Sequence, residues 1–173
     1  MTALRVIGLD LSITATGIAY RDGSTGTAGG SSAMGDRRLV TIVDMVDIAV
    51  GGPDSGLGPL PDLVVLEDLP THAKSAGVTG MVHGAVRALL VRRTVPYALV
   101  TPATLKAYAT GKGTADKTAM AMAAYKRAGR EFADDNQCDA WWLRAAGLDR
   151  LGHPEFPLPG AQRDRLDKAT WPA

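Results

Sequence analysis

The stretch Leu4-Arg5-Val6-Ile7-Gly8-Leu9-Asp10 sets the pattern of this chain, because an apolar strand runs directly into a carboxylate. The run Leu63–Leu66 ends in Glu67 in the same way, and a third acid, Asp139, lies within the segment 134–140. A carboxylate at the end of a buried strand costs desolvation energy unless a partner offsets it. Three that converge would form a cage for a hard divalent cation, and proteins hold Mg²⁺ with few carboxylates plus substrate phosphates. The pattern therefore indicates phosphodiester chemistry.

The length of 173 residues suits one domain with a substantial core and is short for two. No stretch approaches the roughly 18 apolar residues of a membrane span, so we expect no membrane contact. The first strand begins almost at the N-terminus, so we also expect no signal peptide. The only cysteine, Cys138, excludes an intrachain disulfide and fits a reducing cytoplasm, either of a bacterial cell or of a host cell if the protein is viral.

Charge is distributed unevenly along the chain, although the formal net charge is only +1. The segment 39–71 has six acidic residues and no Lys or Arg, whereas the segment 87–130 has nine basic residues and one acid, Asp116. A basic half beside an acidic site suits a polyanion whose cleaved bond lies on a metal. The alternative is that these are solubilising charges scattered over helices.

The order of apolar runs predicts strands first and then strands that alternate with helices, which is a mixed α/β layered fold. Residues 23–35 read as a loop with at most a short edge strand, and the Pro-rich end from His153 reads as an irregular tail. The expected strands cover 4–10, 16–20, 62–69 and 96–100. The expected helices cover 38–50, 76–93, 102–109, 115–129 and 135–148.

Four motifs occur in order along most of the chain. They are Ile7–Ser12 with Thr16-Gly17, then Val65–Glu67, then Val100–Lys106 followed by Gly111–Lys117, and finally Asp135–Ala140. In this order they resemble the first strand and hairpin, the central acidic strand, the lysine-bearing segment and the terminal acidic helix of the RuvC-type Holliday junction resolvases. The resemblance implies a ribonuclease H-like mixed β-sheet flanked by helices. We divide the chain accordingly into a nuclease domain, 1–150, and a Pro-rich C-terminal tail, 151–173.

The resemblance also implies roles for single residues. Asp10, Glu67 and Asp139 would be catalytic carboxylates that bind Mg²⁺, with Mn²⁺ as a substitute. Lys106 and Lys117 would contact DNA phosphate, with Lys117 near the scissile group. The family is dimeric, with one active site per subunit, and it makes paired nicks of like polarity across a four-way junction.

The sequence departs from the family pattern at two places near the site. The family often has Asp or His three residues before the last acid, whereas this chain has Asn136 there and Asp135 one residue earlier. The fourth metal ligand is therefore open between Asn136, Asp135 and water. Members often carry an aromatic wedge shortly after the central Glu, whereas this chain has Asp68-Leu69-Pro70-Thr71, so the resemblance does not carry over a wedge.

The three acids lead to a mechanism on chemical grounds. Two Mg²⁺ ions about 3.5–4 Å apart would clamp the attacking water and the leaving oxygen for in-line displacement. We expect Asp10 to bridge the ions, Glu67 and Asp139 to complete one metal shell each, and Lys117 to balance charge on the transition state. The predicted enzyme is a Mg²⁺-dependent crossover junction endodeoxyribonuclease that cuts four-way junctions and other branched DNA.

Two other functions compete with this interpretation. A junction-binding module with weak or no nuclease activity would follow if Asn136 disables the site. An actin-like ATP-dependent kinase would explain the residues 10–17 as a phosphate loop. That fold needs a duplicated domain for which this chain is too short, so we expect no nucleotide cofactor.

The helix expected over 76–93 is our candidate for the interface of a homodimer, because Gly80 and Gly84 lie four residues apart and allow close approach of another backbone. The alternative is that this helix only covers the sheet. The turn Gly111-Lys112-Gly113 is interpreted as a flexible turn through which Lys112 touches phosphate, with a plain helix break as the alternative. The methionines expected to fill the core are Met81, Met120 and Met122.

Overall fold

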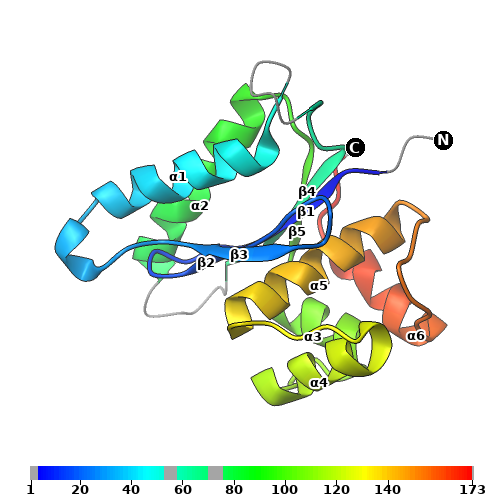
Figure 1. Cartoon of the computed structure of the whole chain (residues 1–173). Coiled ribbons are helices and arrows are strands. Elements are labelled where there is room, and N and C mark those ends of the chain that lie inside the picture. Colours follow the sequence, from blue (N-terminus) through cyan, green and yellow to red (C-terminus); the bar gives the residue numbers. More distant parts are fainter. Residues whose placement is uncertain (1–3, 53–57, 70–75, 173) are drawn as a thin grey trace.

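The structure, a computed structural model, describes residues 4–52, 58–69 and 76–172. Its centre is a five-stranded sheet in the order β3-β2-β1-β4-β5 (Figure 1). β2 is antiparallel to both of its neighbours, whereas β4 runs parallel to β1 and to β5. The strands are β1 (Val6–Asp10), β2 (Thr16–Ala19), β3 (Thr25–Ala28), β4 (Leu63–Glu67) and β5 (Tyr97–Val100).

Helices cover both faces of this sheet, with α1 and α2 on one face and α3 to α6 on the other (Figure 1). Their bounds are α1 (Arg37–Val50), α2 (Ala76–Arg92), α3 (Pro102–Thr110), α4 (Lys117–Ala128), α5 (Asp135–Arg150) and α6 (Gly160–Arg163). The predicted mixed α/β fold is confirmed, with element ends shifted by a few residues at most. Among the helices that the structure describes, none combines the length and apolar character needed to cross a bilayer.

The central strands are buried on both faces, which explains their continuous apolar sequence. Along β1, Val6 packs toward α5, whereas Ile7 and Leu9 pack toward α1 and α2. Along β4, Val65 lies on the α5 side and Leu66 on the other. Because side chains alternate along a strand, the terminal acids of β1 and β4 fall on the α5 side. The methionines differ from expectation: Met120 is buried, but Met81 and Met122 are each 48% exposed.

The C-terminal segment differs from the predicted irregular tail. It forms α6 and a 3-10 helix, η3 (Asp164–Lys168), and its side chains Phe156, Leu158 and Leu166 are buried in the same core as the helices below the sheet. The Phe156 ring stacks on Trp141 at 5.4 Å between centroids. The reason for the difference is tertiary: aromatic packing orders a segment whose local sequence has no helical period. The division into 1–150 and 151–173 itself stays a prediction.

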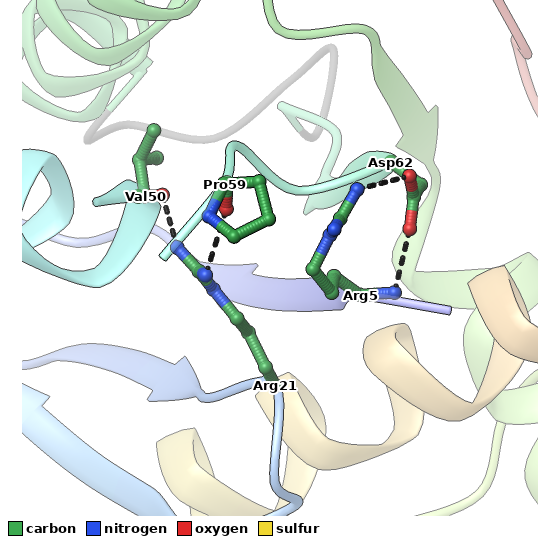
Figure 2. Close-up of polar contacts among 5 residues, drawn as sticks. All are labelled: Arg5, Arg21, Val50, Pro59 and Asp62. Carbon is green, nitrogen blue, oxygen red and sulfur yellow. Dashed lines mark hydrogen bonds and ion pairs between the residues drawn. The ribbon is translucent and has the colours of Figure 1, made fainter. Parts of the chain in front are cut away.

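The segment between α1 and β4 is anchored at its ends by two arginines (Figure 2). Arg21 donates to the carbonyl oxygens of Val50 and Pro59, the latter at 2.9 Å. The backbone N–H and guanidinium of Arg5 both donate to the Asp62 carboxylate, each at 2.8 Å. Arg5 precedes β1 and Asp62 precedes β4, so this pair fixes the starting points of the two parallel strands. Their far ends, which bear the acids, are aligned as a result.

Candidate active site

The terminal carboxylates of β1 and β4 lie side by side. The parallel register pairs Leu9 with Leu66, so the next residue of each strand, Asp10 or Glu67, arrives at the same edge. The Glu67 carboxyl donates a hydrogen bond to the Asp10 carboxylate. Two acids in direct contact cannot both be ionised at low cost, so the pair shares a proton when no cation is present.

Helix α5 brings the third acid, Asp139, because it lies almost directly on the sheet. A Cβ atom on Gly8 would lie 2.0 Å from the Ala140 carbonyl oxygen, and one on Gly17 would lie 2.1 Å from that of Asn136. Only glycine fits where a helix backbone comes this close to a strand. Sequence reasoning did not identify this role, although an isolated glycine inside an apolar strand is its signal. The two glycines therefore set the height of Asp139 above Asp10.

Burial and mutual repulsion raise the pKa of all three acids. The pKa of Glu67 rises to about 9 through burial and the charges of Asp10 and Asp139. The pKa of Asp10 rises to about 7 through burial and then the charge of Asp139. Burial and Asp135 raise the pKa of Asp139 to about 6. Shifts of this kind, from desolvation and like charges in one place, are typical of functional sites.

Two lysines from different helices act on this cluster. Lys106 of α3 lowers the pKa of Glu67 and Asp139, and Lys117 of α4 lowers that of Asp10 and Asp139. Thr101 caps α3 by accepting from the Thr104 N–H, which fixes the first turn of the helix that carries Lys106. Lys117 is exposed and pairs with Asp135, and this contact raises the pKa of Lys117.

Lys112 lies further out than the other two lysines. It is exposed in the turn between α3 and α4, where its backbone N–H donates to the Thr110 hydroxyl at 3.1 Å. Within the described part of the chain, Lys112 is not among the groups that shift the pKa of the three acids. The structure therefore brings Lys106 and Lys117 to the acids and leaves Lys112 on the adjoining surface.

The donor set suits a hard cation in its chemistry. In the part of the chain that the structure describes, no three His, Cys, Asp or Glu side chains are gathered tightly enough to share an ion as they stand. The three acids are nevertheless half-buried, repel one another and offer only carboxylate oxygens, the ligands that Mg²⁺ prefers. A cation among them would remove the repulsion that raises their pKa.

No protein-family model matches the chain. Three relatives named crossover junction endodeoxyribonuclease RuvC do match. The relative from Paenarthrobacter aurescens (strain TC1) is 33% identical over 129 residues, which cover 68% of this chain and 65% of the relative. The relative from Frankia alni is 33% identical over 66% of this chain and 61% of its own length. The relative from Parafrankia sp. (strain EAN1pec) is 31% identical over 66% of this chain and 67% of its own.

The chain belongs to the RuvC family. This membership decides against the actin-like interpretation. The chain spans 65% and 61% of the length of the first two RuvC relatives. Solved RuvC structures show the same ribonuclease H-like fold. Thermus thermophilus RuvC aligns with a TM-score of 0.67 at 21% identity, over 90% of this chain and 100% of that one. The same protein in complex with Holliday junction substrate aligns with a TM-score of 0.68, over 90% and 99%.

The two departures from the RuvC pattern have different outcomes in the structure. Asn136 packs its backbone against Gly17 and is half-buried one turn before Asp139. Asp135 pairs with Lys117, which lowers the pKa of Asp135, and its charge also reaches Asp10 and Asp139. That Asn136 or Asp135 serves as the fourth metal ligand stays a prediction. RuvC proteins often carry an aromatic wedge in the stretch that corresponds to residues 68–71. In this chain Pro70 and Thr71 of that stretch lie outside the described residues.

The raised pKa values of Asp10, Glu67 and Asp139 predict how stability depends on pH without divalent metal. The unfolded chain releases these protons near pH 4, whereas the folded protein holds them up to pH 6–9. The unfolded state therefore binds fewer protons in this window, and stability falls as pH rises from about 4 to about 9. Glu67→Gln should flatten the fall between pH 6 and 9, which for this one group amounts to about 4 kcal/mol over the three pH units, and should stabilise the metal-free protein at pH 9.

Urea unfolding in EDTA at pH 6 and pH 9 measures this effect. Asp44→Asn, at an exposed position on α1, is the matched control and should leave the pH dependence unchanged. An identical slope in wild type and Glu67→Gln would show that Glu67 holds no proton in the folded state.

Proposed function

We propose that this chain is a divalent-metal-dependent endonuclease that cuts branched DNA, with the four-way junction as its main substrate. The half-buried cluster of Asp10, Glu67 and Asp139, faced by two lysines, carries the proposal. A buried set of repelling carboxylates lowers stability, so its presence calls for a cationic partner. The names of the RuvC relatives and the junction-bound RuvC structure support this substrate class.

Asp10, Glu67 and Asp139 would hold Mg²⁺, with the oxygen of Asn136 or Asp135 as a further ligand. Bound Mg²⁺, for which Mn²⁺ would substitute, lowers the pKa of water and neutralises charge on the leaving oxygen, and we propose two ions. Lys117 lies at the entrance and would exchange Asp135 for a phosphate oxygen, which stabilises charge as the phosphodiester bond breaks. Lys106 would bind a DNA phosphate close to Glu67 and Asp139. Lys112 would bind the DNA backbone further from the site.

A cleavage assay with four-way, three-way and linear DNA tests the proposal. We expect nicks in branched substrates with Mg²⁺ and none with Ca²⁺, and paired nicks of like polarity across the four-way junction. Equal cutting of linear DNA would contradict structure selectivity. Tight junction binding without cleavage in Mg²⁺ or Mn²⁺ would instead support the binding module that Asn136 suggests.

The proposed phosphate contact of Lys106 predicts a change in the salt dependence of binding. Each phosphate contact contributes about 0.9 to the slope of log affinity against log salt concentration. Lys106→Ala should therefore weaken junction binding and lower that slope by about 0.9. Fluorescence anisotropy over a salt series in Ca²⁺ measures it. Arg37→Ala, exposed on the opposite face of the sheet, is the control, and an unchanged slope for Lys106→Ala would remove Lys106 from the DNA surface.

We also propose a homodimer that forms through α2. The exposed residues of this helix include a stripe at helical spacing, formed by Gly77, Met81, Gly84, Ala88 and Val91. Val78 and Arg92 are exposed beside it, whereas Gly80 is half-buried. Nothing within 4 Å would meet a Cβ atom on Gly77 or Gly84, so packing within the described chain does not require these glycines. Each glycine costs a helix about 1 kcal/mol relative to alanine. Close approach of the same helix from a second copy would account for both glycines and the exposed Met81.

Met81→Lys tests this interface. We expect the wild-type protein to sediment as a dimer at micromolar concentration and Met81→Lys as a monomer, because a charge would be buried in the contact. Val40→Lys, at a 60% exposed position on α1, should remain dimeric. A dimeric Met81→Lys protein would place the interface elsewhere.

We propose that the protein is cytoplasmic, in a bacterial cell or, if it is viral, in its host cell. Burial raises the pKa of the Cys138 thiol to about 12, so this group stays protonated and inert, as suits a structural cysteine in a reducing compartment.

A further inference from the structure

A groove of about 700 Å³ opens beside the candidate active site. One wall is α4, and the other is formed by residues 130–135 and the first turn of α5. Among its lining residues are Lys117 and Asp139, which belong to the candidate active site. The volume lies within the roughly 300–1,000 Å³ of pockets that hold small ligands. The groove is thus continuous with the site where the scissile phosphate is proposed to lie.

The α4 wall presents an apolar stripe that nothing in the described chain covers. Thr118, Ala121, Met122 and Tyr125 line the groove at spacings of three and four residues, and all four are exposed. Tyr125 is 55% exposed, and Met122, which was expected to fill the core, is 48% exposed. Tyr125 lies eight residues beyond Lys117, which is about 12 Å along a helix. The stripe therefore extends outward from the phosphate-contacting lysine.

The two walls carry different charge. Helix α4 has basic residues at Lys117, Lys126 and Arg127 and no acidic residue. The opposite wall includes Phe132 and the buried Cys138 together with several acidic side chains. The acidic groups that line it are Glu131, Asp134, Asp135 and Asp139. Arg130 also lines this wall, but its guanidinium donates to the Gly23 carbonyl oxygen and lies over the Phe132 ring. A phosphate inside the groove would be repelled by these carboxylates, whereas a neutral base would not, and its exocyclic amines can donate to them.

We propose that this groove takes up an unpaired nucleobase of the cleaved strand, adjacent to the scissile phosphate, with Tyr125 and Met122 as its stacking surface. The proposal rests on the proposed function, because it needs the scissile phosphate at Lys117 and Asp139. Bases next to a crossover are free to leave the stack, and an aromatic side chain that receives one is tolerant of base identity. The strand backbone then follows the basic α4 side, and the base points between the walls. The groove would select DNA whose pairing is interrupted at the cleavage point.

A cycle of protein and DNA changes tests this contact. Four junction substrates are used. Each carries a single abasic residue, at one of the two nucleotides that precede or the two that follow the scissile phosphate. We expect Tyr125→Ala to lower the single-turnover cleavage rate of the intact junction by about tenfold. On one of the abasic substrates, Tyr125→Ala should change the cleavage rate by less than twofold, because the base that Tyr125 would contact is missing there. Tyr125→Phe keeps the ring and should retain the wild-type rate on every substrate.

A second measurement does not depend on cleavage. With Ca²⁺ in place of Mg²⁺, 2-aminopurine at the position found by the cycle should report stacking on Tyr125, so its fluorescence should differ between wild type and Tyr125→Ala. Val40→Ala on α1 is the control for an exposed apolar side chain and should change neither readout.

The outcomes separate the two proposals. If wild type cuts junctions and Tyr125→Ala slows intact and abasic substrates equally at all four positions, the base site is wrong while the nuclease stands. The same holds if Tyr125→Ala has no effect. If wild type neither binds nor cuts branched DNA, the proposed function fails and the base site fails with it. Loss of the Tyr125 effect at one abasic position, with rescue by Tyr125→Phe, supports the groove as a base site.

Discussion

Asp10→Asn is expected to lower the rate of junction cleavage by about a thousandfold, which corresponds to roughly 4 kcal/mol of lost transition-state stabilisation. Asp10 is hydrogen-bonded to Glu67, repelled by Asp139 and attracted by Lys117, so its charge acts on every part of the proposed metal site. Its replacement by a neutral amide of the same shape removes charge but little volume. Single-turnover cleavage in Mg²⁺ measures the loss.

Junction binding by this variant should be unchanged or tighter, because one negative charge facing the phosphate is gone. Asp44→Asn on α1 makes the same chemical change on an exposed surface and should keep full activity. Wild-type cleavage by Asp10→Asn would remove Asp10 from the metal site and, with it, the main support for hydrolysis at this cluster.

The second large effect is on folding. Gly8→Ala is expected to lower the free energy of unfolding by more than about 4 kcal/mol or to prevent accumulation of folded protein. The new Cβ atom would lie 2.0 Å from the Ala140 carbonyl oxygen and 2.6 Å from the Arg144 backbone nitrogen. Both are backbone atoms of α5, so the helix must move away from the sheet as a unit. Overpacking against side chains alone costs less, about 1–3 kcal/mol.

Chemical unfolding followed by circular dichroism measures this loss. Gly160→Ala is the control, because nothing lies within 4 Å of a Cβ atom at that position, and its stability should stay within about 1 kcal/mol of wild type. If Gly8→Ala is as stable as wild type, α5 does not lie on β1 at this distance, and the placement of Asp139 over Asp10 is wrong.

Much of the sheet and the position of its acids could be predicted from the sequence, because β1 and β4 are continuous apolar runs with a carboxylate at the last residue. The start of α5 was predictable for a local reason, since Asp134 accepts from the Gln137 N–H at 2.8 Å and caps the helix. The pairing of Asp10 with Glu67 needed only the rule that parallel strands end at one edge. The lysines came from the resemblance, and the structure brings Lys106 and Lys117 near the acids.

What could not be predicted depends on contacts between distant segments. The C-terminal helices owe their order to the stacking of Phe156 on Trp141, which no local period reveals. Met122 is an apolar residue of a type usually found in the core. Only the arrangement of α4 and α5 leaves it exposed in the groove. The contact of Gly8 and Gly17 with α5 likewise appears only once the helix is placed on the sheet.

The pairing of Thr170 with Leu99 has a consequence for shortened forms of the protein. The two residues exchange backbone hydrogen bonds of 2.9 Å in each direction, so the last residues act as a cover for the outer strand β5. Without them, the unpaired amides and carbonyls of that strand would be open to a strand from another molecule, which is the usual route to edge-to-edge association. Trimming the chain after residue 150, the domain boundary expected from the sequence, should therefore yield material that self-associates. An affinity tag is better attached at the other terminus.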